Sequence, residues 1–266
     1  MSDIITSGYS SRLIDSHAHL DFPEFDVDRD AVFESMRKIG IEKVIIPGVS
    51  PSHWDKQLQV ASRYSCPYAL GIHPWFCDEN FSLALSKLDK IVGVKHQNSD
   101  FIAIGECGLD KRHHSDWQVQ IQVLEHQLML AKSFELPIIL HVVKAHSEII
   151  SLLKRYKLVR GGVIHGFSGS AELANEYVKL GYKLGIGGLI LNHEARKLRG
   201  CVAHIGLESI LVETDSPAMS PKKSVKKRNT PLVLPAIIAE IAKLQKKSTV
   251  LVSEQVGLNV FQLFDF

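Results

Sequence analysis

Residues 12–22 read RLIDSHAHLDF, an apolar run that leads into two histidines flanked by aspartates. If this segment is a strand, His17 and His19 point to the same face, because side chains alternate along a strand. Two imidazoles so close together could bind one metal ion. The competing interpretation is a pair of strand-end histidines that hydrogen-bond to neighbouring groups. The rest of the chain has to decide between the two.

Similar short apolar runs recur along the chain and alternate with helix-like segments. The eight runs are residues 12–17, 43–48, 68–73, 101–106, 137–141, 161–165, 182–187 and 209–214. Helical spacing is clearest in 116–134 and in 231–247, which opens with a proline. This α/β alternation without hairpin signals predicts a parallel sheet. Eight repeats predict a closed TIM (β/α)8 barrel, with a doubly wound open sheet as the alternative.

The composition is that of an ordinary soluble globular protein: 266 residues, 45% hydrophobic and 23% charged. The net charge of +2 is too small to indicate nucleic-acid binding, although a local basic patch could. There is no linker-like or low-complexity tract, so we expect an N-terminal extension over 1–12 and a single domain over 13–266.

The cysteines are scattered and form no C-x-x-C pair, which argues against a zinc ribbon or a disulfide framework. They are Cys66, Cys77, Cys107 and Cys201. The first twelve residues lack the pattern of a signal peptide. No apolar run approaches the roughly 18 residues of a transmembrane helix. We therefore expect a cytoplasmic protein with reduced thiols and no membrane partner.

Most of the predicted strands end in a histidine or an acid. In a parallel barrel these ends form one rim, which is where such folds place their chemistry. Each residue has an ordinary explanation on its own, but together they favour a shared metal centre. The strand-end residues are His17, His19, His73, Glu106, His141, His165, Glu213 and Asp215.

Four histidines and two carboxylates are more ligands than one tetrahedral site needs, so we predict two divalent ions. Glu106, on the central strand, is the natural bridge between them. The remaining ligands divide into His17, His19 and Asp215 for one ion, and His141 and His165 for the other. Nitrogen and oxygen ligands without thiolate suit Zn or Mn, and Mg less obviously.

The ordered motifs LIDSHAHLD, GIHP, IGECGLD, PIILH, HGFSGS, GYKLGIGG, ETDSP and RNTPLVLP run from residue 13 towards the C-terminus. With them the chain resembles the TatD-type metal-dependent deoxyribonucleases of the amidohydrolase superfamily, and most closely their YjjV-like branch. The resemblance implies a barrel with its metal centre at the C-terminal rim. It also implies metal-dependent hydrolysis of DNA phosphodiesters, often from the 3′ end. The implied ligands are His17, His19, Glu106, His141, His165 and Asp215.

On this basis we expect a metal-bound hydroxide to attack the phosphodiester in line. Asp215 and Glu106 are the predicted catalytic residues, with Asp215 accepting the proton of the water. His73 is predicted to contact the phosphate, although a structural strand-end histidine is the alternative. Glu213 and Asp15 are expected to orient ligands, and Asp15 could be purely structural.

Two positions depart from the family pattern. Val143, followed by Lys144, stands where the family commonly has an arginine, and lysine offers a mobile point charge instead of a bidentate clamp. Trp75 stands where many relatives have a second histidine. Both changes bear on substrate choice. Together with Trp54 and Phe76, Trp75 could stack on bases at the rim or simply pack in the core.

Residues 222–231, KKSVKKRNTP, carry five positive charges within seven residues and lie close in sequence to Asp215. Such a run is usually a solvated loop. On the catalytic rim we favour contacts with the phosphate backbone. The predicted substrate-binding residues are therefore Lys227 and Arg228, together with His73 and Lys144.

Three functions remain open. The first is a nuclease acting on DNA, as single strands or at 3′ ends. The second is a related esterase or lactonase, because the same hydroxide could attack a carbonyl carbon. The third is a metal-binding protein without catalysis. We expect a monomer or a weak oligomer.

Overall fold

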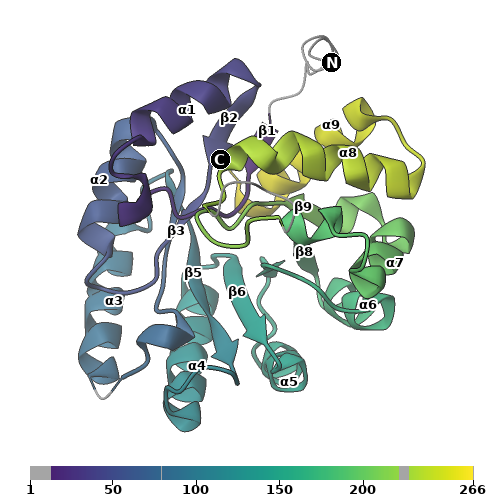
Figure 1. Ribbon diagram of the computed structural model, residues 1–266. Helices are drawn as coiled ribbons and strands as arrows, with labels where there is room; N and C mark the ends of the chain where they lie inside the picture. Colours follow the sequence, from purple (N-terminus) through teal and green to yellow (C-terminus); the bar gives the residue numbers. More distant parts are fainter. Residues whose placement is uncertain (1–12, 79, 222–227, 266) are drawn as a thin grey trace.

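The computed structural model describes residues 13–78, 80–221 and 228–265, and Figure 1 shows a central curled sheet surrounded by helices. The strands are β1 (Leu13–Asp15), β2 (Ile41–Val44), β3 (Ile46–Pro47), β4 (Tyr68–Leu70), β5 (Phe101–Asp110), β6 (Ile138–Val143), β7 (Gly162–Ile164), β8 (Tyr182–Ile186) and β9 (Ile210–Val212). The α-helices are α1 (Arg29–Lys38), α2 (Trp54–Tyr64), α3 (Phe81–Lys95), α4 (Trp117–Ser133), α5 (His146–Tyr156), α6 (Ala171–Lys179), α7 (Arg196–His204), α8 (Leu234–Gln245) and α9 (Thr249–Phe264). Short 3-10 helices are η1 (Pro23–Phe25), η2 (Pro74–Phe76), η3 (Gly188–Leu191), η4 (Leu207–Ser209) and η5 (Pro231–Val233).

All strand pairs of the described chain are parallel. Strands β3 to β9 form one sheet in sequence order, and β1 pairs with β2. Only Ile45 separates β2 from β3. Its N–H donates to Asp15 O at 2.9 Å, whereas the next N–H, of Ile46, donates to Pro67 O at 3.0 Å. The run predicted as one strand over 43–48 therefore pairs first with β1 and then turns to the β4 side.

The ring closes between β1 and β9. Ser16 N–H donates to Val212 O at 3.0 Å, and Asp215 N–H donates to His17 O at 2.9 Å. These bonds join the first strand to the last, so the predicted closed barrel is confirmed and the open-sheet alternative is wrong. Closure also places His17 and Asp215, which are far apart in sequence, next to each other.

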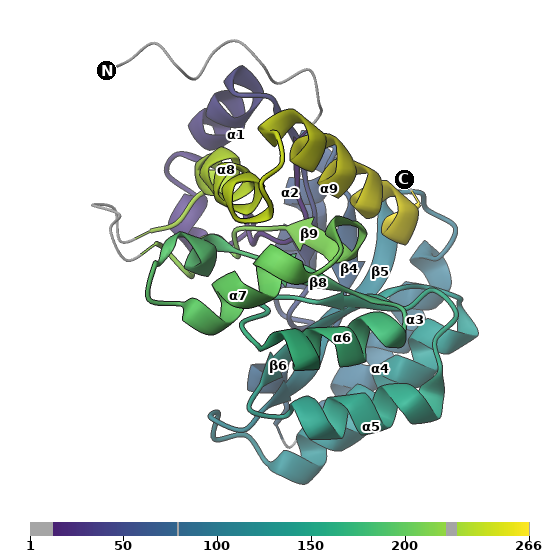
Figure 2. The same cartoon turned by 90° about the vertical axis from the view of Figure 1, so that its right-hand side faces the viewer.

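A small apolar layer fills the barrel directly below the rim. It includes Ile139 and Val163, each fully or almost fully buried and two residues before a strand-end histidine. Residues two apart share one face of a strand, so this layer lies under the histidines. Val260, Leu263 and Phe264 of α9 belong to the same cluster. Helix α9 therefore packs against the amino end of the barrel, and the carboxyl end is left for chemistry (Figure 2).

The two clearest predicted helices are also present. Helix α4 begins after Asp116, whose carboxylate accepts hydrogen bonds from two N–H groups of the first turn, as an N-cap residue does. The segment 231–247 forms η5 and then α8. No helix in the described part of the chain is long and apolar enough to cross a membrane. The extension over 1–12 lies outside the described residues, and the single domain over 13–266 stays a prediction.

Candidate metal centre

Glu106, at the middle of β5, lies at the centre of a buried group of histidines and is itself 2% exposed. Its Oε2 atom faces His17 Nε2 at 3.1 Å and His19 Nε2 at 3.4 Å. Asp215 Oδ1 lies 3.7 Å and 3.8 Å from the same two nitrogens. One oxygen of Glu106 thus completes a half-site with His17, His19 and Asp215, on the β1 and β9 side of the rim.

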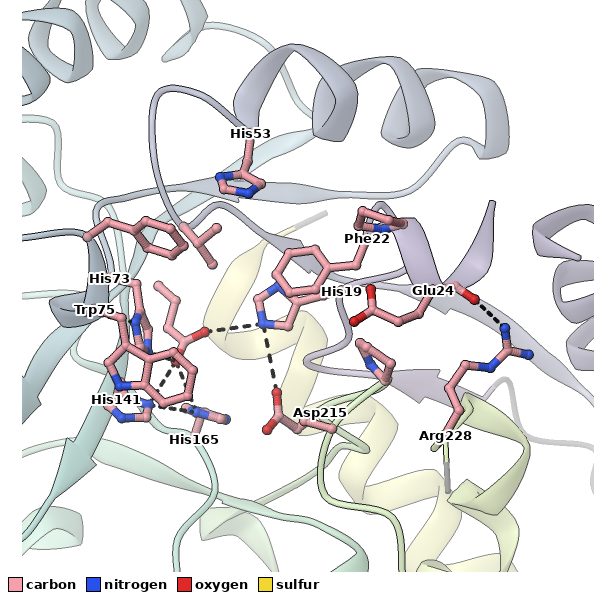
Figure 3. Close-up of a pocket in the computed structure, with 16 residues that line it drawn as sticks. His19, Phe22, Glu24, His53, His73, Trp75, His141, His165, Asp215 and Arg228 are labelled. Carbon is pink, nitrogen blue, oxygen red and sulfur yellow. Dashed lines mark hydrogen bonds and ion pairs between the residues drawn. The ribbon is translucent and has the colours of Figure 1, made fainter. Parts of the chain in front are cut away.

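The other oxygen of Glu106 faces a second set of imidazoles. Oε1 lies 3.1 Å from His141 Nδ1 and 3.1 Å from His165 Nε2. His73 Nε2 lies 3.3 Å from it. Figure 3 shows His73, His141 and His165 gathered together, with His19 and Asp215 beside them. The structure therefore brings the six predicted ligands together, and it adds His73 to the second half-site.

Carboxylates lie close to the outer ring nitrogens of two histidines in the second half-site. His141 Nε2 lies 3.3 Å from Asp110 Oδ2, and His165 Nδ1 lies 3.5 Å from Glu213 Oε1. Asp110 accepts a hydrogen bond from His141 Nε2–H, so a neutral His141 ring would have its lone pair on Nδ1, the nitrogen that faces Glu106. His73 is the reverse case, because its Nδ1 accepts from Trp75 N–H at 3.1 Å. The proton of neutral His73 is then on Nε2, which makes it a donor towards the centre.

The electrostatics of the cluster match a cation site. Burial alone would raise the pKa of Glu106, but the neighbouring imidazoles, above all His165 and His73, hold it well below its usual range. Burial lowers the pKa of His73 to about 4. Within the described chain, both ring nitrogens of His17 are buried without a hydrogen-bond partner. Buried nitrogens without a partner are costly when nothing binds them, and a nitrogen and oxygen donor set without thiolate fits divalent metal ions.

Asp110 is a candidate site residue that the sequence analysis missed. It ends β5 four residues after Glu106, on the same face of a strand that is buried throughout. Its Oδ2 atom faces His141 Nε2 and also accepts from Trp75 Nε1 at 2.8 Å. Burial would raise the pKa of Asp110, but the bonds from His141 and Trp75 hold it far below its usual range. The same-face spacing from Glu106 was the signal that could have revealed it.

Glu213 and Asp15 lie where the sequence analysis expected residues that orient ligands. Besides facing His165, Glu213 Oε1 accepts from Gly166 N–H at 2.5 Å. A Cβ atom at Gly185 would lie 2.1 Å from Glu213 Oε2, so only glycine leaves room for this carboxylate. The Asp15 carboxylate accepts from His17 N–H at 3.2 Å and from the Thr214 hydroxyl at 2.6 Å. Asp15 therefore links β1 to the segment after β9.

The predicted substrate-binding residues are dispersed. His73 lies in the cluster, whereas Lys144 is exposed just beyond the end of β6. Arg228 lines the cavity, but its guanidinium binds both oxygens of Asp28 at 2.8 Å and 2.6 Å. Lys227 lies outside the described residues. Arg228 belongs to the predicted basic loop, and this ion pair with Asp28 partly neutralises its positive charge.

The three aromatic residues considered for base stacking lie in different environments. Trp54 is 4% exposed and donates from Nε1 to Gly71 O at 3.2 Å, so it is a core residue and the stacking role considered for it is wrong. Phe76 is half-buried and lines the cavity, and Trp75 stands at its mouth with 55% of its surface exposed.

A cavity of about 920 Å³ opens above the cluster. Its floor carries the candidate ligands, and its walls are mainly apolar and aromatic. The wall residues are Phe22, Pro23, Val49, Trp75, Phe76, Pro217 and Ala218, with Glu24, His53 and Arg228 among them. A cavity of this size over a buried donor cluster can hold a small organic group together with bound ions.

A model of the protein family described as TatD related DNase matches residues 14–265. The chain belongs to this family. This TatD family member is 34% identical to an Escherichia coli (strain K12) protein named uncharacterized metal-dependent hydrolase YjjV, over 96% of this chain and 98% of that protein. It is 31% identical to a Klebsiella pneumoniae (strain 342) protein named 3′-5′ ssDNA/RNA exonuclease TatD, over 95% of this chain and 97% of that protein.

The crystal structure of YjjV, a TatD homologue from Escherichia coli K12, superimposes with a TM-score of 0.90 at 33% identity. The match covers 96% of this chain and 99% of that chain. The resemblance and the enzyme class inferred from the motifs are thereby confirmed. This TatD family member is a metal-dependent hydrolase that acts on ester bonds.

Replacing Asp110 by asparagine is expected to weaken metal binding in this TatD family member. The variant loses the negative charge that faces His141 Nε2, and comparable outer residues of metal sites contribute about 10- to 100-fold in affinity. Competition with a metal-sensitive dye would measure the change. Asp100→Asn is the matched control, because Asp100 is exposed just before the same strand. Equal affinities of the two variants would contradict the role of Asp110.

Proposed function

We propose that this chain is a 3′–5′ exonuclease that hydrolyses phosphodiester bonds of single-stranded DNA with two divalent metal ions. One observation carries the proposal: the two oxygens of the buried Glu106 carboxylate face two separate sets of imidazoles. A bridging carboxylate between two cation sites suits an in-line displacement, because both the attacking and the leaving oxygen can be stabilised. The exonuclease name of the Klebsiella relative supports the substrate class.

Under this proposal Glu106 would help to hold both ions, one with each carboxylate oxygen, and the other candidate ligands form two sets. The first set is His17, His19 and Asp215, and the second set is His141 and His165. The donors suit Zn or Mn, and Mg less well. When bound, such ions would supply charge neutralisation at the phosphoryl oxygens and lower the pKa of a water molecule.

The side chains of this chain have distinct tasks in the proposed reaction. Asp215, whose side chain is 16% exposed at the cavity floor, accepts the proton of the attacking water at its carboxylate and returns it to the leaving oxygen. His73 donates from Nε2–H to a phosphoryl oxygen, which agrees with a neutral ring that accepts at Nδ1. His73 is therefore proposed as a substrate-binding residue and not as a ligand.

Backbone phosphates beyond the scissile bond need contacts outside the cavity floor. We assign Lys144 to this task, because it is exposed at the carboxyl end of β6 beside the second half-site. Lys227 stays proposed on its sequence position alone. Arg228 is proposed to hold η5 against η1 and α1 as well, because it binds Asp28 and stacks over Phe25 at 4.6 Å. Such phosphate contacts add affinity without reading sequence.

An esterase or lactonase is the second candidate. The apolar cavity walls favour it, because residues such as Phe22, Val49 and Phe76 suit a compact apolar substrate better than a charged strand. The same proton acceptor, Asp215, would serve attack on a carbonyl carbon. A cytoplasmic location and a monomeric or weakly oligomeric state stay predictions.

The deciding experiment uses full-length protein stripped with a chelator and reloaded separately with Mg, Mn, Zn or Co. End-labelled single-stranded DNA is then incubated with each sample and the products are separated by length. We expect stepwise, metal-dependent shortening of the 5′-labelled strand. A 3′-labelled strand should release its label in the first step. No cleavage by protein that contains stoichiometric metal would overturn the nuclease, and esters and lactones would be tested next.

A further inference from the structure

The indole of Trp75 is a large apolar ring left open at the mouth of the cavity. It is 55% exposed, whereas the tryptophan of the core, Trp54, is 4% exposed. Figure 3 shows Trp75 in front of the histidine cluster, beside His73 and His141. An exposed ring at the lip of a binding site can gain much by covering its surface with a ligand.

The ring is held in place although it is exposed. Its Nε1–H donates to Asp110 Oδ2 at 2.8 Å. His113 stacks on it, with the ring centroids 5.6 Å apart and an interplanar angle of 18°. A ring fixed in this way loses little conformational freedom when a ligand binds, so more of the contact energy appears as affinity.

Its position suits a group attached to the reacting phosphate. The Trp75 centroid lies 5.1 Å from that of His73 and 6.2 Å from that of His141, both edge-to-face. A planar group bonded through a sugar to a phosphate at Glu106 would therefore reach the indole.

Positive charge lies on the same side of the rim. Arg112 N–H donates to the other oxygen of Asp110 at 2.8 Å, which places Arg112 beside the Trp75 contact. Lys111 N–H donates to Val143 O at 3.0 Å, so the exposed Lys144 follows directly on the neighbouring strand. Arg112 and Lys144 are both exposed, so a DNA strand that leaves the cavity past Trp75 would pass close to two positively charged residues.

We propose that Trp75 is a specificity residue that stacks on an unpaired nucleobase next to the scissile phosphate. The inference rests on the proposed nuclease function. A base can reach the indole only when it is not stacked in a duplex, so this contact selects single-stranded substrate. Every base has a π face, so the contact is tolerant of sequence.

Intrinsic fluorescence gives a test that needs no turnover. The chain has three tryptophans; Trp54 is buried, and Lys111 Nζ covers Trp117 at 5.2 Å. Titrating metal-loaded protein with a phosphorothioate-linked single-stranded oligothymidylate should quench the Trp75 contribution. The matched duplex should quench much less. Trp75→Phe should show no comparable quenching, and unchanged wild-type fluorescence at saturation would overturn the proposal.

A second test measures affinity and turnover after removal of either the Trp75 indole or the base that it is proposed to contact. Trp75→Ala should weaken oligonucleotide binding, measured by anisotropy, by about 5- to 150-fold, the range of one base–aromatic stack. The KM should rise with kcat largely kept. An abasic site next to the scissile bond should weaken wild-type binding similarly, and the variant much less. Additive effects of the two changes would overturn the stacking contact.

The controls separate this inference from the nuclease proposal. Trp117→Phe should leave affinity unchanged, because its ring is already covered. The metal content of each variant is also measured, because Trp75 contacts Asp110 and its removal must not lower metal binding. Trp75-dependent quenching without any cleavage would support the stacking contact and reject the nuclease. Cleavage that is unchanged in Trp75→Ala would support the nuclease and reject the stacking contact.

Discussion

Replacing Glu106 by glutamine is expected to abolish metal binding at both half-sites and activity with it. Both oxygens of the carboxylate face histidine nitrogens, and no other described acid reaches both sets. The neutral amide turns a donor group towards one set and removes the charge shared by two cations. We expect metal affinity to fall by more than the ~100-fold typical of outer-shell changes, and hydrolysis to fall to background.

Elemental analysis after gel filtration, together with the metal-induced shift in thermal midpoint, measures this loss. Ligands that bind only the folded state raise its stability, so the shift should vanish in the variant. Glu213→Gln is the graded control, because Glu213 faces only the outer nitrogen of His165. It should retain most of the metal. Full metal occupancy of Glu106→Gln would show that Glu106 is not the bridge.

Asparagine in place of Asp215 is expected to separate metal binding from chemistry. The amide is a poor proton acceptor but keeps a neutral oxygen near His17 and His19. Asp215 has a φ of 53°, in the left-handed region that asparagine also tolerates, so the fold should persist. General-base catalysis contributes about 10² to 10⁴ in rate, and we expect a loss of kcat of about 10³-fold.

Single-turnover cleavage of end-labelled DNA, with metal content measured on the same samples, tests this expectation. Asp215→Asn should retain the ion of the second half-site, in contrast to Glu106→Gln. Normal kcat in a fully loaded Asp215→Asn variant would move the proton acceptor elsewhere. Loss of all metal would instead show that Asp215 acts mainly as a ligand.

Much of the fold followed from local patterns. Eight apolar runs with helical segments between them predicted the barrel, because period-two and period-3.6 spacings are properties of neighbouring residues. The strands predicted over 12–17 and 101–106 have other ends, because β1 ends at Asp15 before the two histidines and β5 continues past Glu106 to Asp110. His17 and His19 nevertheless both face Glu106 Oε2, as predicted for residues on one face. Local pattern could not show that the run over 43–48 changes partners at Ile45, because that depends on where β1 and β4 lie.

The roles of side chains depended on contacts between distant segments. Arg228 looked like a free phosphate contact, but folding brings Asp28, 200 residues earlier, against its guanidinium. Asp110 gained a role only when His141 of the neighbouring strand came within 3.3 Å. His73 became a donor because the backbone of Trp75 turns back onto its Nδ1.

The order of residues along the chain thus specified which chemical groups arrive at the rim, since strand periodicity is local. Strand pairing and ring closure decided which of them meet. Ring closure places the first strand beside the last through Asp215 N–H and His17 O at 2.9 Å, and the finished barrel surrounds one carboxylate with five imidazoles from four different segments. Charges, tautomers and partners are set by these long-range distances, and for that reason the tertiary structure decided them.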